Sequence, residues 1–293
     1  MIIRFSKFVA VIISFILISV AFFFALSDER KVSTVSAQPE SRELPIIMYH
    51  HITTDASKAG KYTVLVSEFE NDLEYLSKKG YTTVTVADLI SYVDGKGDLP
   101  DKPVMITFDD GFESFYILAC PLLKERNMKS VVSVIGKITE KYSETEDHNI
   151  NYSNLNFNQI SELSSSGLVE IQNHSYDMHI SAQGQRKGIS KLDIETYDEY
   201  KKNLSNDLLT LQKILKLNCG ITPQCVTYPY GAYSDETLEI IKKLGFKSTM
   251  LCEERINTIV QGDENSLYNL GRYNRPSGVS TEEFFSRIKK PGP

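Results

Sequence analysis

Residues 104–111, VMITFDDG, decide the fold of this chain, because an apolar run ends there in Asp109, Asp110 and Gly111. A short apolar run bounded by turn residues is typical of a buried strand in a parallel sheet. The carboxyl ends of such strands carry the active site, and Gly111 lets the chain bend so that both acids face one pocket. One acid could hold a metal while its neighbour takes up protons. An Asx turn after the strand would explain the same residues without any function.

On both sides of this strand, short apolar runs alternate with amphipathic stretches, as expected when helices connect parallel strands. The sequence therefore predicts an α/β, barrel-like domain of about seven strands. The predicted strands are Ile46–Tyr49, Thr82–Val86, Val104–Phe108, Ser130–Val134, Leu168–Gln172, Cys225–Tyr228 and Ser248–Cys252. The predicted helices begin at the capping pairs Ser67/Glu70 and Ser280/Glu283 and near Ile194, and the last of these buries Leu204, Leu208, Leu211 and Leu215.

The N-terminal region predicts export. Residues 8–26 are free of charge and follow Arg4 and Lys7, which favours a helix that spans the lipid bilayer as an anchor. We expect a cytoplasmic N-terminus (1–7), a transmembrane signal-anchor (8–26), an extracytoplasmic tether (27–43) and an α/β domain (44–293). Cleavage after Val35-Ser36-Ala37 is the alternative, and it would give a secreted form. In that oxidising setting Cys219 and Cys225 could pair or stay free thiols.

The composition excludes several classes of function. With 32 Lys and Arg against 38 Asp and Glu, the chain has a net charge of −6, and no long basic run offers a surface for nucleic acid. The four cysteines lack the C-x-x-C pairs of a zinc ribbon. No protein partner is evident from the sequence, and the oligomeric state is not encoded in any pattern.

Two of the five histidines, His174 and His179, follow the predicted strand Leu168–Gln172. On a regular helix this spacing would put the two side chains about 140° apart, so shared metal ligation requires a loop. Together with Asp110 the pair completes a set of two histidines and one carboxylate, although an isolated histidine is more often structural. His148 lies in a polar, acidic stretch and is predicted to be solvated.

Two other predicted strands are followed by residues that could take part in catalysis. The strand Ile46–Tyr49 ends in His50 and His51, either of which could supply a proton at neutral pH or lie at the surface. The strand from Cys225 is followed by residues 228–231, YPYG. A tight turn there could direct a backbone N–H at a developing oxyanion, but the same residues could form a turn without function.

Taken together, TFDDG, HSYDMH, YPYG and the opening IMYHH resemble the NodB-homology polysaccharide deacetylases (carbohydrate esterase family four) over residues 44 to about 280. The resemblance implies a distorted (β/α) barrel and a metal-dependent deacetylase. It implies that Asp109 is the general base and that Asp110, His174 and His179 bind one divalent metal ion. Zinc suits these ligands, and Co, Ni or Mn could occupy similar ones.

The histidine spacing and the early Tyr49-His50 are similar to the poly-N-acetylglucosamine deacetylase branch of the IcaB and PgaB type. In that branch the catalytic acid comes from the N-terminal strand, which favours His50. The same similarity implies that the Tyr230 amide binds the oxyanion. The arginine expected in the YPYG motif is missing, and Arg272 is our hypothesis for its substitute.

The resemblance implies that N-acetyl groups are removed from a cell-surface polysaccharide containing N-acetylglucosamine, either peptidoglycan or poly-N-acetylglucosamine. Asp109 would take a proton from the attacking water, and His50 would protonate the departing amine. No covalent acyl-enzyme would form, because no Ser or Cys nucleophile is required. The alternatives are an O-acetyl esterase, a catalytically inactive glycan-binding barrel and a glycoside hydrolase with two carboxylates.

Overall fold

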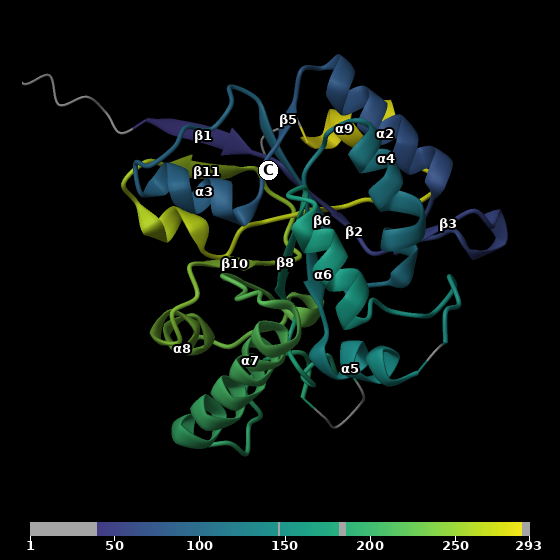
Figure 1. Ribbon diagram of the computed structural model, residues 1–293. Coiled ribbons are helices and arrows are strands. Elements are labelled where there is room, and N and C mark those ends of the chain that lie inside the picture. The colour runs from purple at the N-terminus through teal and green to yellow at the C-terminus, as the bar shows by residue number, and fades with distance from the viewer. Residues whose placement is uncertain (1–39, 146, 182–185, 289–293) are drawn as a thin grey trace, which may run out of the picture. The chain divides into compact units, whose positions relative to one another are not determined.

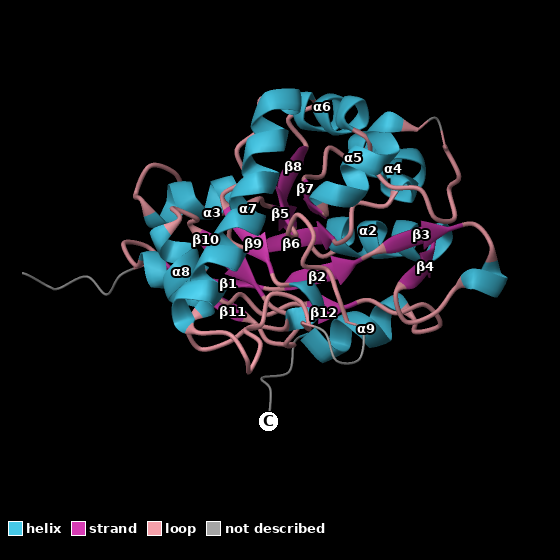
Figure 2. Cartoon of the chain, turned by 90° about the horizontal axis from the view of Figure 1, so that it is seen from below, coloured by secondary structure: helices cyan, strands magenta, loops and turns pink. Residues whose placement is uncertain are grey.

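The computed structural model describes residues 40–145, 147–181 and 186–288. At its centre lies a curled parallel sheet, and Figures 1 and 2 show the helices around it. In spatial order the strands are β10 (Ser248–Met250), β9 (Cys225–Thr227), β8 (Val169–Asn173), β7 (Ser130–Val134), β6 (Pro103–Phe108), β2 (Ile46–Tyr49) and β12 (Tyr273–Asn274). The short strand β5 (Thr82–Thr83) pairs with β6 outside this series.

Each of the seven predicted strands overlaps a strand of the structure, and the α/β class is confirmed. The prediction at Thr82–Val86 was too long, because only Thr82–Thr83 is a strand and Val86 begins a helix. The expected barrel is only partial, and the sheet is an open half-barrel. Its edge strands β10 and β12 do not pair with each other among the described residues. Met250 of β10 forms one isolated bridge to Leu270, which precedes β12 in the chain. Strand β12 was not predicted, because two residues are too few to show an alternation of apolar and polar side chains.

Two further strand pairs lie outside the main sheet. Strand β1 (Ser41–Leu44) pairs antiparallel with β11 (Asn257–Val260), and β3 (His51–Thr53) pairs parallel with β4 (Thr63–Leu65). Strand β1 includes residues 41–43, which the sequence assigned to the tether. The assignment failed there because only Leu44 of this polar strand is buried.

Helices connect the strands and pack against one another around the sheet, with α2 against α9, α5 against α6, α6 against α7 and α7 against α8. Their bounds are α2 (Val66–Lys78), α3 (Val86–Val93), α4 (Cys120–Glu125), α5 (Gly136–Glu144), α6 (Phe157–Ser165), α7 (Tyr197–Cys219), α8 (Thr237–Lys243) and α9 (Thr281–Ile288). Four shorter turns complete the list: η1 (Ala56–Lys58), η2 (Phe115–Ala119), η3 (Pro229–Gly231) and η4 (Glu264–Leu267).

The helix signals in the sequence were mostly correct. The leucine stripe of α7 is fully buried, and the Ser280 side chain accepts a hydrogen bond from the Glu283 amide at 3.2 Å. The start of α2 was wrong by two residues. The N-cap is Leu65 and not Ser67, and the helix begins at Val66. The Leu65 amide donates to the Glu68 side chain at 3.1 Å.

Alternate residues of each strand enter different parts of the core, as the two-residue period of a strand requires. Ile46 and Met105 face the inside of the half-barrel, whereas Ile47 and Ile106 face the layer of α2, α4 and α9. A third cluster lies between the sheet and helices α7 and α8. Apolar packing on both faces fixes the strand register and thereby the positions of the strand ends.

The predicted anchor at residues 8–26 lies outside the described residues. Within the described ranges, no helix combines the length and the apolar character that a membrane span requires. All four cysteines are free thiols, so Cys219 and Cys225 are not paired in this structure.

Candidate active site

Side chains with the expected chemistry meet at the carboxyl edge of the sheet. His50 follows β2, Asp109 and Asp110 follow β6, and His174 follows β8. Together with His179 they line a cavity of about 700 Å³. Because parallel neighbours end at the same edge, residues far apart in the sequence come together here.

Three of the strand-end turns contain a residue other than glycine in the left-handed region. These residues are Asp110 (φ 67°), Ser175 (φ 73°) and Tyr230 (φ 57°). The left-handed region is unfavourable for residues with a Cβ atom and is often found at functional sites. Gly111 also has a positive φ, of 68°, and a Cβ at this position would lie 3.0 Å from a methyl group of Val134. The turn after β6 therefore depends on glycine, as the sequence indicated.

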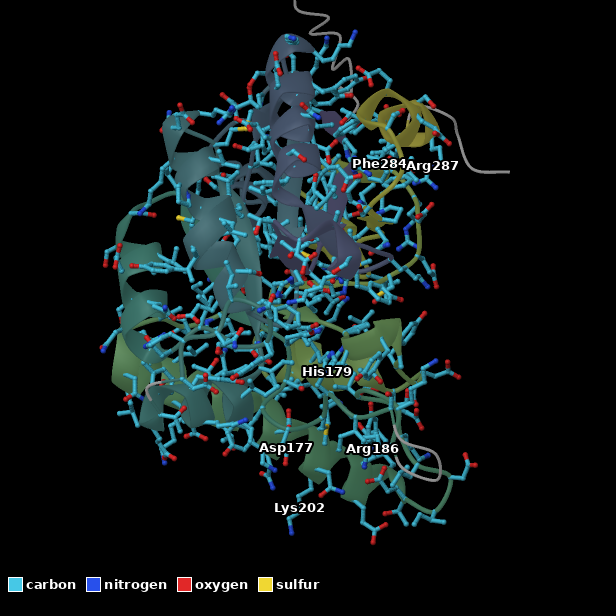
Figure 3. The ribbon with its side chains drawn as sticks, turned by 90° about the vertical axis from the view of Figure 1, so that its right-hand side faces the viewer. Asp177, His179, Arg186, Lys202, Phe284 and Arg287 are labelled. Atoms are coloured by element: carbon cyan, nitrogen blue, oxygen red, sulfur yellow. The ribbon has the colours of Figure 1, made fainter. Side chains whose placement is uncertain are left out.

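Asp110, His174 and His179 form one group whose ligand atoms all lie within 4.8 Å of one another. The Nε2 atoms of His174 and His179 lie 3.4 and 3.1 Å from Asp110 Oδ1. Donors bound tetrahedrally to one zinc ion are roughly 3.3 Å apart, which follows from metal–ligand distances of about 2.0–2.1 Å. His179 lies in the part of the chain that also carries Asp177, well away from α9 (Figure 3).

The hydrogen bonds around these ligands favour a bound cation. His174 Nδ1 lies 2.8 Å from the carbonyl oxygen of Thr227, so this nitrogen carries the proton and donates. In the neutral ring Nε2 then presents a lone pair to Asp110 Oδ1, a buried atom that receives no hydrogen bond. Two acceptors that face each other need a proton or a metal ion between them. The residues therefore fit a divalent cation.

Charge and burial act in opposite directions on Asp110. Burial alone raises the pKa of its carboxyl group, but the facing imidazole rings of His174 and His179 lower that pKa far below its ordinary value. The group is consequently ionised at neutral pH, which is the state that a metal ligand requires.

Asp109 forms a buried, bidentate ion pair with Arg272. The two guanidinium nitrogens donate to the two carboxylate oxygens at 2.7 and 2.8 Å, and both side chains are buried. Arg272 Nε also donates to the Leu251 carbonyl at 2.8 Å. Burial raises the pKa of Asp109, but the charge of Arg272 outweighs it and the net pKa is lowered. The structure thus places Arg272 against Asp109.

The two adjacent histidines have different surroundings. His50 lines the cavity, its Nδ1 has no hydrogen-bond partner among the described residues, and its ring lies 4.9 Å from that of Tyr62. His51 Nε2 instead donates to the Ile150 carbonyl at 2.9 Å, and its ring packs edge-on against Phe112. Burial lowers the pKa of His50, against the opposing charges of the two aspartates. His51 also lines the cavity and its Nδ1 is likewise without a partner, but its Nε2 is held by the Ile150 carbonyl.

Tyr230 lies in η3, after β9, and is 41% exposed. Its hydroxyl oxygen is 3.0 Å from His179 Nδ1, and the two ring centroids are 4.4 Å apart. The sequence reasoning assigned a role only to the Tyr230 amide and missed this contact. A hydrogen bond to the outer nitrogen of a histidine ligand fixes its ring orientation and favours Nε2 as the ligand atom.

Two supporting residues were also missed. Asn154 donates to the Asp110 carbonyl oxygen at 2.7 Å. Buried Glu113 accepts from Gln159 Nε2 at 2.7 Å, and the same carboxylate lies 2.6 Å from His148 Nδ1. His148 is exposed, as predicted, and its ring also lies against this carboxylate. Glu113 follows the DDG motif closely, which was the available signal, but its partners are far away in the sequence.

Comparison with known proteins defines the class. The polysaccharide deacetylase model matches residues 96–249, which is more than half of the chain, and the chain therefore belongs to this family. The poly-beta-1,6-N-acetyl-D-glucosamine N-deacetylase of Staphylococcus aureus (strain MRSA252) is 28% identical over 197 residues, covering 67% of this chain and 63% of the relative. The protein of the same name from Escherichia coli (strain K12) is 25% identical over 235 residues, covering 74% of this chain and 35% of the relative.

The chain thus spans less than two thirds of either relative. Among solved structures, IcaB from Ammonifex degensii is 26% identical, with a TM-score of 0.65 over 80% of this chain and 92% of that one. The Streptococcus pyogenes deacetylase PplD in complex with acetate has a TM-score of 0.69 over 86% of this chain and 100% of that one. Its identity is 22%, so this likeness concerns the fold alone.

Proposed function

We propose that this protein is a metal-dependent hydrolase that removes N-acetyl groups from a polysaccharide containing N-acetylglucosamine. One observation carries the proposal: two histidine nitrogens converge on an unbonded oxygen of Asp110, beside the ion-paired Asp109, in a cavity that also holds His50. The names of the S. aureus and E. coli relatives support the same substrate chemistry.

Each residue would have a separate task. A divalent cation bound by Asp110, His174 and His179 would supply Lewis acidity toward the acetamide carbonyl group and toward water. Asp109, held ionised by its arginine, would take a proton from the attacking water. His50, whose ring lines the cavity, would donate a proton to the departing amine nitrogen.

Two other groups would complete the site. The backbone N–H of Tyr230 would donate to the developing oxyanion, as the family resemblance implies. The Tyr230 hydroxyl would hold the His179 ring in place. Water would attack directly, so acetate would leave without a covalent bond to the protein.

The experiment is acetate release by the full-length chain, kept in mild detergent because of apolar residues 8–26. The substrates are poly-β-1,6-N-acetylglucosamine oligomers, peptidoglycan and an O-acetylated sugar, each with and without a chelator. We expect release from an N-acetylated polymer that stops with chelator and returns when Zn²⁺ or Co²⁺ is added. Asp109→Asn should retain the metal and lose turnover.

Three results would contradict the proposal. Release that persists after metal analysis shows a metal-free protein would exclude the metal mechanism. Hydrolysis of the O-acetyl sugar alone would identify an esterase, and metal binding without release from any substrate would indicate a glycan-binding barrel.

We further propose that the domain works outside the cytoplasm, tethered by residues 8–26. The support is the uncharged stretch of membrane-spanning length that follows Arg4 and Lys7. The test is cell fractionation combined with protease treatment of intact cells. Recovery of the protein in the soluble cytoplasmic fraction would contradict this proposal.

A further inference from the structure

The rim of the cavity is positively charged, although the chain as a whole has a net charge of −6. Three lysines line the cavity, namely Lys58, Lys61 and Lys187. All three are exposed, and among the described lining residues Glu254 is the one exposed carboxylate that opposes them. Local positive charge on an acidic protein concentrates anionic ligands near that site.

The acids inside the cavity do not neutralise these lysines. Asp109 is paired through both oxygens with buried Arg272. Asp110 is shared by His174 and His179, which makes it a ligand for a cation. The ammonium groups at the rim therefore remain available to a bound molecule.

The segment that carries Lys58 and Lys61 is held in place by its backbone. The Asn274 side chain donates to the Lys61 carbonyl at 3.0 Å, and the Ser277 amide donates to the Gly60 carbonyl at 3.0 Å. The His51 amide donates to the Tyr62 carbonyl at 3.1 Å. This rim is thus a fixed part of the cavity wall.

Lys58 still has bonding capacity. Its ammonium group donates to Asn151 Oδ1 at 2.6 Å and lies 3.8 Å from Asp55, whose side chain is 48% exposed. An exposed ion pair at this distance is weak, and an ammonium group has three donors.

The rim adjoins the reaction centre through Tyr62. This tyrosine is 49% exposed, lines the cavity and lies against the His50 ring. A sugar next to the reacting residue would therefore meet Tyr62 and the neighbouring lysines.

We propose that Lys58 and Lys61 bind a carboxylate or phosphate group on the sugar that flanks the reacting N-acetylglucosamine. This inference rests on the proposed deacetylase function and specifies its substrate as an acidic glycan. The product chemistry agrees with it. Each deacetylation leaves an ammonium group, so a polymer of N-acetylglucosamine alone would become a polycation that the lysines repel. The acidic groups of an acidic glycan would still be attracted to the lysines after deacetylation.

The experiment compares substrates that differ only in charge, using the full-length protein in detergent at low salt. For the carboxylate, N-acetylglucosaminyl-N-acetylmuramic acid is compared with its methyl amide. For the phosphate, 6-phosphorylated diacetylchitobiose is compared with diacetylchitobiose. Acetate release gives kcat and KM, and titration calorimetry gives Kd even for a ligand that is not turned over.

We expect one charged substrate to have a kcat/KM about three- to tenfold higher than its neutral partner, through KM, with the difference shrinking at high salt. In the Lys58→Gln/Lys61→Gln variant this preference should disappear, because kcat/KM falls more for the charged substrate than for its neutral partner. Lys202→Gln is the matched control, because this exposed lysine of α7 does not line the cavity.

The larger of the two preferences identifies the acidic group as carboxylate or phosphate. Equal kcat/KM and Kd within both pairs would overturn the inference, as would a preference that survives in the double variant. Equal acetate release from charged and neutral sugars would leave the deacetylase function intact. Charge-dependent binding without acetate release would instead contradict the function and retain the acidic-glycan site.

Discussion

The buried pair of Asp109 and Arg272 gives the sharpest test of how the site is held. Replacing Arg272 with methionine keeps a long side chain but leaves the Asp109 carboxylate buried without its partner. Breaking one partner of a buried ion pair costs about 3–5 kcal/mol of unfolding free energy. For a domain of this size, that corresponds to a fall in Tm of roughly 6–20 °C.

A double-mutant cycle isolates the interaction between the two residues. Asp109→Asn alone also destabilises, because it leaves the guanidinium buried and unpaired. The double variant Asp109→Asn/Arg272→Met removes both charges and should lose less than the sum of the single variants, by about 2–3 kcal/mol. Arg272→Lys keeps the charge but not the planar fork, so we expect a correctly folded protein whose kcat falls by about 10²-fold.

The assay is urea unfolding, monitored by far-UV circular dichroism because the chain contains no tryptophan for fluorescence. Arg275→Met provides the control, because this buried arginine pairs with Asp72, at 2.7 Å, instead of Asp109. Its combination with Asp109→Asn should be additive to within about 0.5 kcal/mol. A coupling energy equally small for Arg272 would refute the reasoning that this arginine holds the Asp109 carboxylate.

Four further expectations follow from single contacts. Asp110→Asn should abolish stoichiometric metal uptake measured by mass spectrometry, together with the rise in Tm that added Zn²⁺ gives the wild type. Asn154→Ala should weaken metal affinity by about 10–100-fold in a competition titration, because the Asp110 backbone loses its donor. His50→Ala should lower kcat by about 10²–10⁴-fold, whereas His51→Ala should spare kcat and reduce unfolding free energy by about 1–3 kcal/mol. Burial raises the pKa of Glu170, so in urea titrations the stability of the wild type relative to Glu170→Gln should fall as pH rises from about 4 to about 7.

Most of the strands that were predicted from the sequence have side chains buried on both faces. All six residues of β6 are buried, so its apolar run was unambiguous. Strand β1 has one buried residue and β12 has two residues in all, so neither leaves a pattern. Their pairing with β11 and β2 depends on contacts more than 200 residues apart in the sequence. Local periodicity carries no information about such pairs.

For the site, the residue types were predictable and their contacts were not. Asp110, His174 and His179 stand directly after strands or in the loop that follows, and parallel topology alone brings such positions together. The choice between His50 and His51 could not be made from their identical side chains. In the structure the two rings differ because the Ile150 carbonyl, 99 residues away in the sequence, binds His51 Nε2.

The left-handed residues explain how the ligands can be positioned before any cation binds. Each such residue costs roughly 1–3 kcal/mol, and it persists only where its surroundings hold it. Asn154 binds the carbonyl of left-handed Asp110, and Asn173 accepts a hydrogen bond from the amide of left-handed Ser175 at 2.8 Å. These contacts come from residues that bind no metal themselves. These contacts therefore offset the backbone strain at Asp110 and Ser175. The fold alone positions Asp110 and His174, so a bound ion is not needed to create their arrangement.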